Sequence, residues 1–338
     1  MKKIILGVDG GNTKTDYFLF TSDGEFIDFF RGPTCSHEQF RSSYEGSYDA
    51  MKKVFDDFLS KNGITSKDIY ASVFGLAGVD TPTQKENIEK VVARLGFNNF
   101  KVVNDSFLGV KAVTTSGVCS INGTGTSSGG IDKDGNYLQV GGIGGIVGDE
   151  AGGSHIGRCA IRAAYDDCYR FGKPTTLTKI IMDYFKVTDK YYLMEAISDG
   201  IVGRKIDYSF LNQQVFKEAR DGDEVSNDIL RQIGENTARS AGGVVSNLNF
   251  GEVVDVVLAG SVWVKGASPV MIEEFTNKIT QFTKNKCNII TLNVPPATGA
   301  VIWAMELANG VYPDENLRSL IVGNVEKELN RIEGNIWK

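Results

Sequence analysis

A segment near the start of the chain, DGGNTKTD at residues 9–16, combines carboxylates, glycines and hydroxyl side chains. Apolar runs at 4–8 and 17–20 predict two strands joined by a tight turn. Such a turn gathers backbone N–H groups and the Thr13 and Thr15 hydroxyls in a space suited to a phosphate tail. We expect Asp9 to hold a hydrated Mg²⁺. The residues expected to bind the cofactor phosphates are Gly10, Gly11, Asn12, Thr13 and Lys14. The alternative is an ordinary hairpin turn.

A second segment of this kind, NGTGTSSGG, lies at residues 122–130 between two further predicted strands. Two such turns, each opening a domain, could grip the β- and γ-phosphates of a nucleotide from both sides. Here Thr124, Gly125 and Thr126 are the expected contacts. Neither segment is a Walker loop, because no Gly-Lys-Ser/Thr follows the glycines. A single glycine-rich loop would be a weak signal, and the pair is more specific.

Between the two segments, a short strand at 101–103 ends in Asn104-Asp105, and a helix is predicted to start at Ser106. This order places a carboxylate at the bottom of a cleft between domains. We favour Asp105 as the general base that accepts the proton of an attacking hydroxyl during phosphoryl transfer. The alternative is that Asp105 or Ser106 caps the helix.

The stretch GGIGGIVGDEAGG at residues 141–153 suggests main chain close to a polar ligand, with Asp149 accepting hydrogen bonds from hydroxyls. Alternatively, Asp149 and Glu150 stabilise the N-terminus of a helix that begins there. Further on, a buried strand ends at Gly260-Ser261, which we expect to contact adenosine. Small residues at helical spacing from 297 to 304 favour close helix packing at an inter-domain hinge.

The elements that must position these groups alternate between strands and helices, which indicates an α/β protein. Each half opens with antiparallel strands, has a glycine- and threonine-rich turn between the first two, and then adds helices and strands. We therefore expect an N-terminal domain at 1–113, a C-terminal domain with a helical insertion at 114–310, and a terminal helix at 311–338 that packs back on the first domain.

The amino-acid composition limits the classes of partner and metal site that we expect for this protein. The chain has 338 residues, with 36 Lys and Arg against 42 Asp and Glu, and no basic stripe that would suit a nucleic acid. No apolar run is long enough to cross a bilayer, and residues 1–3 lead into a strand, so the cytoplasm is expected. The five cysteines are scattered without a C-x-x-C pair, and only two histidines occur, so neither a zinc ribbon nor a histidine-rich metal site is indicated.

Together these motifs resemble the BadF/BadG/BcrA/BcrD ATPase family, and within it the N-acetylglucosamine kinase-like branch, over residues 4–308. The resemblance includes GLAG at 75–78, VND at 103–105, GDE at 148–150 and SVW at 261–263. It implies two actin-like, ribonuclease H-like α/β domains that face each other across a nucleotide and substrate cleft.

The resemblance further implies phosphorylation of an N-acetylhexosamine at its 6-hydroxyl by ATP and Mg²⁺, in amino sugar metabolism or cell wall recycling. A homodimer is also implied. Asp105 falls where the family has its general base, Asp149 where a carboxylate contacts sugar hydroxyls, and residues 34–38 where the acetamido side of the sugar is held. The substrate-binding residues implied are Ser36, His37, Glu38, Gly78, Asn104, Asp105, Gly123, Gly142, Asp149 and Gly153.

Several positions depart from the family pattern. Residues 151–153 read AGG where the family usually has Gly-Ser-Gly, His155 replaces a common aromatic residue, and Ile143 replaces a tryptophan of the mammalian enzyme. Smaller residues could admit the 3-substituent of N-acetylmuramic acid. Glu38 could instead attract the ammonium of glucosamine and repel a lactyl carboxylate. We place N-acetylglucosamine first, with N-acetylmuramic acid and glucosamine behind it.

Two other functions compete with a sugar kinase. One is an ATPase that activates a 2-hydroxyacyl-CoA dehydratase or aryl-CoA reductase through an iron–sulfur cluster shared by two subunits. Cys119 and Cys159 have a suggestive separation, but Cys119 is expected inside a strand and Cys159 within a helix. The other is an actin-like structural or regulatory protein. Against it stand Asp105 and the glycine-rich stretch, which favour an acceptor substrate.

Overall fold

The computed structural model describes residues 2–334 and contains two five-stranded mixed sheets. The first sheet has the order β3-β2-β1-β4-β5, and the second has the matching order β8-β7-β6-β9-β10. The strands of the first sheet are β1 (Ile4–Gly10), β2 (Lys14–Thr21), β3 (Phe26–Pro33), β4 (Ile69–Leu76) and β5 (Phe100–Val103). Those of the second are β6 (Gly117–Asn122), β7 (Thr126–Ile131), β8 (Tyr137–Gly141), β9 (Val253–Ala259) and β10 (Lys286–Thr291).

The two sheets repeat one topology. In each, the first three strands form an antiparallel meander, and the last two run parallel to the first strand. The hairpins β1–β2 and β6–β7 are therefore equivalent, as the two glycine-rich turns predicted. The carboxyl ends of β1, β4 and β5 meet at one edge of the first sheet, where ligands bind in open α/β sheets. The predicted α/β class with two actin-like domains is confirmed.

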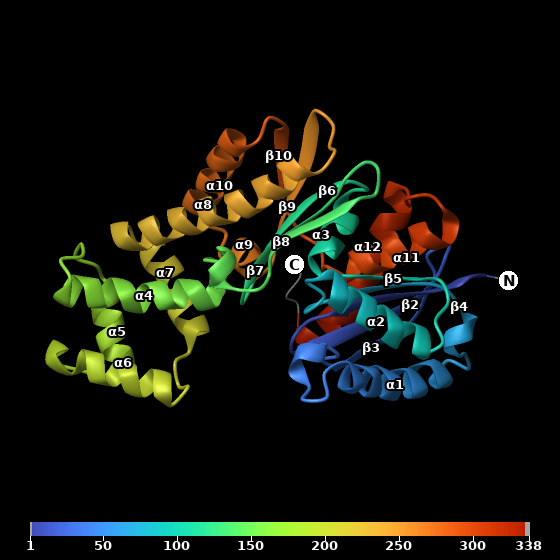
Figure 1. The fold of residues 1–338 in the computed structure, drawn as a ribbon, viewed down its shortest axis with the longest axis horizontal. Helices are drawn as coiled ribbons and strands as arrows, with labels where there is room; N and C mark the ends of the chain where they lie inside the picture. The colour runs from blue at the N-terminus through green and yellow to red at the C-terminus, as the bar shows by residue number, and fades with distance from the viewer. Residues whose placement is uncertain (1, 335–338) are drawn as a thin grey trace.

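Helices cover both faces of the first sheet (Figure 1). On one face, α1 (Tyr44–Lys61) and α2 (Pro82–Arg94) pack through Phe55, Phe58 and Val92 against Leu6 and Val8. The start of α2 is fixed locally, because Thr81 and Gln84 form a capping box and Pro82 occupies the first turn. The other face contacts α11 (Ala297–Asn309), and α12 (Glu315–Glu333) packs on α11 and β3.

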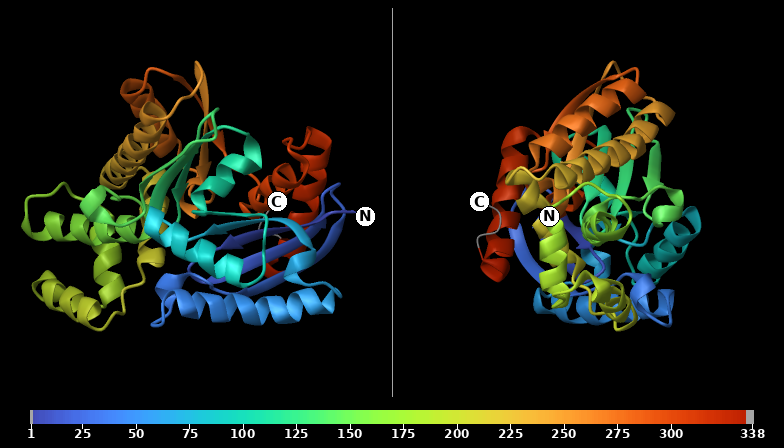
Figure 2. Two further views of the ribbon diagram at one scale, coloured as in Figure 1. Left: turned by 45° about the vertical axis from the view of Figure 1, so that its right-hand side comes forward. Right: turned by 90° about the vertical axis from the view of Figure 1, so that its left-hand side faces the viewer.

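Most of the second half is helical (Figures 1 and 2). Four helices, α4 to α7, form a lobe that projects away from the first sheet, and α8 and α10 lie side by side along the second sheet. The helices are α4 (Gly152–Tyr169), α5 (Leu177–Phe185), α6 (Leu193–Val202), α7 (Tyr208–Arg220), α8 (Glu224–Asn247), α9 (Ser261–Val264) and α10 (Pro269–Phe282). No helix within residues 2–334 has the length and apolar character needed to span a membrane.

Two helices lie between the sheets and exchange partners. Helix α3 (Ser106–Val113) follows the first sheet in sequence but packs on β6, β7 and β9, whereas α11 follows the second sheet but packs on β1 and β4. Both helices share one core with residues of both sheets, including Val73 and Val257. The predicted boundaries at residues 113 and 310 divide the chain by sequence, and the packing places 297–309 against the first sheet.

The crossing of α3 and α11 depends on Gly299. A Cβ at this position would lie 1.9 Å from the carbonyl oxygen of Leu108 and 3.0 Å from the backbone nitrogen of Ala112. Backbone atoms cannot yield as a flexible side chain can. The helices therefore approach this closely only because residue 299 lacks a side chain.

We predict opposite effects of the same substitution at two helical glycines. Gly299→Ala should destabilise the protein by about 1–3 kcal/mol because α11 must move away from α3. Gly323→Ala, on α12 with open space around the added methyl group, should stabilise it by about 0.5–1 kcal/mol through helix propensity. Thermal unfolding of both variants beside the parent checks this. Equal stability of the two variants would contradict the packing argument.

Candidate active site

Asp9 and Asp105 lie at the same edge of the first sheet. Asp9 is near the end of β1, beside Asp16 of β2, and Asp105 directly follows β5. Asp105 is the N-cap residue of α3, yet its side chain makes no capping hydrogen bond. Instead, Asn104 Oδ1 accepts a 2.9 Å bond from the backbone N–H of Ser106. The neighbouring asparagine thus supports the helix start, and the carboxylate of Asp105 is left for another role.

The first glycine-rich turn is a tight hairpin whose tip faces solvent. The N–H of Gly11 donates to the carbonyl of Lys14 at 2.9 Å, and the hydroxyl of Thr34 donates to the carbonyl of Gly11 at 2.8 Å. Asn12, Thr13 and Lys14 are exposed, and Gly10 ends β1 in a buried position. The turn therefore presents its backbone and the Thr13 hydroxyl at the mouth of the cleft.

The prediction for Thr15 is wrong. Its hydroxyl is buried, lies 3.4 Å from Cys35 Sγ and accepts a 3.2 Å hydrogen bond from the backbone N–H of Cys35. The physical reason is that Thr15 belongs to β2 and pairs with Gly10, so its side chain packs inside the domain rather than in the turn. Only Thr13 remains as a hydroxyl donor of this turn.

Negative charge is concentrated around Asp9. Burial, together with Asp16 and Asp105 nearby, raises the pKa of Asp9 to about 8. The guanidinium of Arg31 donates hydrogen bonds of 2.6 and 2.8 Å to Asp16, and the charges of Lys14 and Arg31 oppose the rise in the pKa of Asp9. Oxygen ligands crowded in this way fit Mg²⁺, which could be held by Asp9 with the remaining positions filled by water and phosphate.

The second glycine-rich turn is attached to the start of α4. Its carbonyls at Gly123 and Thr124 accept hydrogen bonds of 2.7 and 3.2 Å from the N–H groups of Gly153 and Ser154. The hydroxyl of Thr126 donates to the carbonyl of Ile121 at 2.9 Å and so helps to close the hairpin. Gly125 completes the turn by accepting a bond from the N–H of Gly123 at 2.9 Å.

The end of β9 lies against this turn. Gly260 has φ +95°, and a Cβ there would lie 2.5 Å from the carbonyl oxygen of Asn122, so only glycine permits the approach. Ser261 then opens α9 and lines a cavity of about 430 Å³. The opposite wall comes from α7, with Asn212, Gln213 and Arg220.

This polar cavity includes Ser261, one of the two residues that the sequence analysis expected to contact adenosine. A Cβ at Gly153 would lie 3.2 Å from Asn212 Nδ2, so the cavity adjoins the residue that supports the second turn. Lys265 of the segment after α9 also lines it. Sequence reasoning found Gly260 and Ser261 but missed the α7 residues, since nothing in the pattern of an amphipathic helix distinguishes a wall of a cavity from an ordinary surface.

On the first-domain side, the segment after β3 lies beside the segment after β4. Ser36 is buried with its hydroxyl unpaired, and Glu38 is exposed. A Cβ at Gly78 would lie 3.0 Å from Ser36 Oγ and 3.1 Å from the Glu38 side chain, so the three residues adjoin. His37 is held differently, since its ring stacks on Tyr44 at 4.5 Å and burial lowers its pKa.

On the second-domain side, Asp149 organises the glycine-rich loop. Its Oδ2 accepts hydrogen bonds of 2.8 and 2.7 Å from the N–H groups of Gly142 and Gly144. Asp149 thus ties both ends of the segment from Gly142 to Asp149 together. Ala151 is the N-cap residue of α4 and makes no side-chain capping bond, and stabilisation of this helix start by the charges of Asp149 and Glu150 stays a prediction that is compatible with the loop contacts.

The two sides are joined by a residue that sequence reasoning missed, Asp80. Its Oδ1 accepts hydrogen bonds from Asn104 Nδ2 at 3.0 Å and from Gln139 Nε2 at 2.6 Å. It also influences Asp105, whose pKa rises to about 6, first through burial and then through the charge of Asp80. The fold thus brings together Glu38, Gly78, Asn104 and Asp105 with Gly142 and Asp149, whereas Gly123 and Gly153 belong to the second turn.

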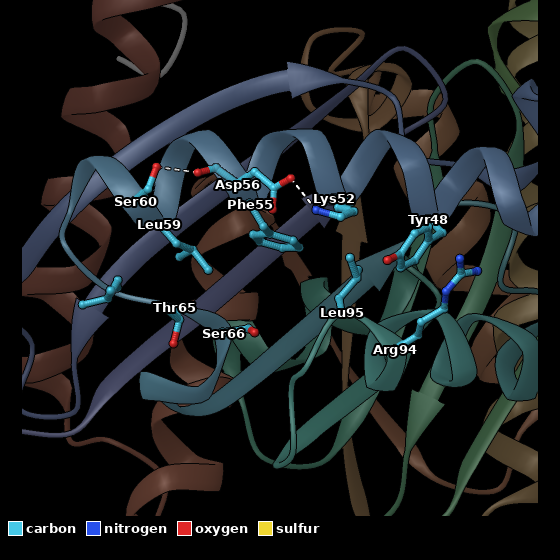
Figure 3. A pocket seen from close by; sticks show the side chains of 11 residues that line it. Tyr48, Lys52, Phe55, Asp56, Leu59, Ser60, Thr65, Ser66, Arg94 and Leu95 are labelled. Carbon is cyan, nitrogen blue, oxygen red and sulfur yellow. Dashed lines mark hydrogen bonds and ion pairs between the residues drawn. The ribbon is translucent and has the colours of Figure 1, made fainter.

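Another cavity lies elsewhere. It measures about 350 Å³ and lies between α1 and the end of α2, beside Lys52, Asp56 and Arg94 (Figure 3). None of the predicted site residues lines it. Its walls already pair with one another or with close neighbours, since Lys52 bonds Asp56 and Arg94 bonds Glu45.

Relatives of known name match almost the whole chain. The chain is 30% identical over 306 residues to the N-acetylmuramic acid/N-acetylglucosamine kinase of Clostridium acetobutylicum, with 89% of this chain and 98% of that protein covered. It is 25% identical over 323 residues to the N-acetyl-D-glucosamine kinase of Dictyostelium discoideum, with 90% and 98% covered.

Solved structures share the fold. A proposed N-acetylglucosamine kinase from Chromobacterium violaceum has a TM-score of 0.65 at 20% identity, with 91% of this chain and 99% of that chain covered. A glucokinase of the ROK family from Streptomyces griseus has a TM-score of 0.53 at 16% identity, with 91% and 100% covered. Both are similar to this chain in overall fold. The model of the BadF/BadG/BcrA/BcrD ATPase family matches residues 6–304, and the chain therefore belongs to that family.

Proposed function

We propose that this protein is an ATP-dependent kinase that phosphorylates an amino sugar at its 6-hydroxyl, with N-acetylglucosamine as the first candidate. The observation that carries the proposal is the position of Asp105. Asp105 lies just beyond the carboxyl end of β5, and its side chain makes no hydrogen bond that caps α3. Its charge contributes to the raised pKa of Asp9 by the first turn, and the charge of Asp80 at the acceptor side contributes to its own raised pKa. The names of the relatives from Clostridium acetobutylicum and Dictyostelium discoideum support the same substrate class.

In this mechanism the nucleoside occupies the cavity beside Ser261, and the two glycine-rich turns hold the phosphates through backbone N–H groups and the Thr13 hydroxyl. Bound Mg²⁺ would neutralise charge on the transferring phosphoryl group. Asp105 accepts the proton of the sugar hydroxyl as the new O–P bond forms and the bond from the γ-phosphorus to the β–γ bridging oxygen breaks, which releases ADP. Its raised pKa of about 6 makes it a stronger base than an ordinary aspartate while it remains ionised at neutral pH.

The acceptor side is rich in carboxylates. Glu38 and Asp149 both lie close enough to Asp80 to raise its pKa, with burial as the larger cause. Such a group favours neutral hydroxyls as hydrogen-bond donors and disfavours an anionic substituent. We therefore place N-acetylglucosamine ahead of N-acetylmuramic acid, although the Clostridium acetobutylicum relative is named for both sugars. Use of Mg²⁺ and assembly as a homodimer stay predictions.

The iron–sulfur activator is the second candidate, and the cysteines speak against it. Cys119 is fully buried in β6, where its sulfur packs beside Gly109, and Cys159 is half-buried in the middle of α4. A cluster shared between subunits needs thiolates at the surface, whereas burial raises the pKa of both thiols. Purified protein without colour or bound iron would remove this candidate.

The direct test of function is release of ADP from Mg-ATP in the presence of single sugars. We expect the highest kcat/KM with N-acetylglucosamine and a lower value with N-acetylmuramic acid and glucosamine. Glucose, which lacks an amino substituent, is the control and should give no activity. Mass spectrometry of the product should show one added phosphate at the 6-position. Silence across the panel would overturn the kinase proposal.

Asp105→Asn should lower kcat by about 10²–10⁴-fold, since no base remains to accept the proton, while binding of a fluorescent ATP analogue is unchanged. For the parent protein, kcat/KM should fall as the pH drops through about 6, because protonated Asp105 cannot act as base. Asp57→Asn on the exposed face of α1 is the matched control. Transfer that survives in Asp105→Asn would exclude this role.

The charge at Asp9 should also affect stability. Folding raises the pKa of Asp9 from 3.8 to about 8, so between these values the folded protein holds a proton that the unfolded chain lacks. Without Mg²⁺, this group therefore costs stability increasingly as the pH rises from about 4 to 8. At pH 8, the melting temperature of Asp9→Asn should be about 2–4 °C higher than that of the parent for each kcal/mol of destabilisation that the substitution removes. Near pH 4, the two melting temperatures should differ little.

Mg-ATP should reverse this order, because it should stabilise the parent protein and have a smaller effect on Asp9→Asn. A difference in melting temperature that is the same at pH 4 and pH 8 would contradict the origin of the effect in Asp9.

A further inference from the structure

We infer that Asp80 is a positioning residue that fastens the two domains together at the acceptor end of the cleft and thereby sets the place of the sugar relative to Asp105. The inference rests on the proposed function for its substrate, but its structural part can be tested without any substrate. Asp80 lies just after the GLAG segment and belongs to none of the motifs that the sequence singled out.

One oxygen of Asp80 makes both contacts. Oδ1 accepts from Asn104 Nδ2, on the segment that leads directly into Asp105, and from Gln139 Nε2 on β8 of the second sheet. The first contact stays within the first domain, and the second crosses to the other domain. A carboxylate suits this junction because a charged acceptor makes shorter and stronger bonds to amide donors than a neutral one.

The backbone of Asp80 is also held in place. The backbone N–H of Asp80 donates to Gln84 Oε1 at 3.0 Å, and Gln84 is fixed by the capping box of α2. The side chain therefore projects from an anchored piece of backbone, and movement of Asp80 would require the start of α2 to move too. A group mounted in this way can transmit position, which a freely rotating carboxylate cannot.

On the second-domain side, the contact reaches the glycine-rich loop. A Cβ at Gly142 would lie 2.7 Å from Asp80 Oδ1 and 2.8 Å from Gln139 Nε2, so the bare backbone of Gly142 fits against the Asp80–Gln139 pair. The N–H of the same glycine donates to Asp149. The path Asn104, Asp80, Gln139, Gly142, Asp149 thus connects the neighbour of the base to the carboxylate expected to bind sugar hydroxyls.

This arrangement places carboxylates of like charge close together, which is unfavourable. Burial and the nearby carboxylates of Glu38 and Asp149 raise the pKa of Asp80, and the hydrogen bond from Gln139 opposes that rise. Three acids gathered at one end of a cleft would be easier to accommodate if one of them were an amide. A carboxylate kept at this junction is consistent with a role that needs a strong acceptor.

The test compares Asp80→Ala, Asp80→Asn and Gln139→Ala. Asp80→Ala should raise KM for the acceptor sugar about 10–100-fold while KM for ATP changes less than about 2-fold, since the nucleotide cavity is elsewhere. Asp80→Asn keeps only a neutral acceptor oxygen and should recover part of the loss. Gln139→Ala removes the bond to Asp80 and also the 3.2 Å bond from Gln139 Nε2 to the carbonyl of Gly141, so it should raise acceptor KM as well. In the double variant the two effects should be less than additive, because Asp80→Ala already removes the Asp80–Gln139 bond.

Hydrogen exchange tests the junction without substrate. In Asp80→Ala and in Gln139→Ala, amides at 139–149 should exchange about 10-fold faster than in the parent, as their closed state is less populated. Asp314→Ala, which removes the N-cap of α12 outside this junction, is the control and should lower the melting temperature without the change in acceptor KM. Unchanged exchange overturns the proposal even if no sugar is phosphorylated, and equal increases of both KM values would also overturn it.

Discussion

The close crossing of α3 and α11 is the constraint on which the rest of the molecule depends. The backbones of Gly299 and Leu108 meet in the middle of a core to which both sheets contribute. Because α3 begins at the residue after Asp105, the crossing also fixes where Asp105, the proposed base, lies between the sheets. The equivalent edges of the two sheets then provide the two glycine-rich turns. The helix that fills the inter-domain core is therefore also the one that positions the proposed base.

The carboxylates of the site lower the stability of the protein without ligands. Asp9, Asp80 and Asp105 all have raised pKa values, and burial is the largest cause for each. Arg31 pairs with Asp16, and under the proposed function Asp9, Asp80 and Asp105 gain favourable partners when a metal ion, a nucleotide and hydroxyls bind. Such strain is common where groups are placed for a ligand rather than for folding.

Much of this arrangement could be predicted from the sequence, because its strongest signals are local. A few consecutive residues are enough to identify each of these features: strands with β-branched residues, turns with paired glycines, and a strand that ends in Asn-Asp. The error at Thr15 came from the extent of β2, which begins at Lys14, before the apolar run 17–20, so that Thr15 pairs with Gly10 and its hydroxyl turns into the interior. Element boundaries are the part of a pattern that tertiary packing most easily moves.

The missed residues carry no local signal. Gln139 is one polar position in a strand of alternating character, Asp80 is a single acid before a helix, and Asn212 is one of several polar residues on α7. Their significance arises only when segments distant in sequence meet, as Asp80 and Gln139 do across 59 positions. The same holds for the exchange of α3 and α11, which no periodicity within either helix indicates.

The exchange of helices has a consequence for how the chain is made. During synthesis the first sheet leaves the ribosome long before residues 297–309, so its α11-binding face, with Ile5, Phe18 and Val73, stays uncovered while almost 200 further residues are added. The second sheet is completed only by β10, and the shared core closes only when α11 follows it. We therefore expect the first third of the nascent chain to need protection of its apolar strands until synthesis is nearly complete.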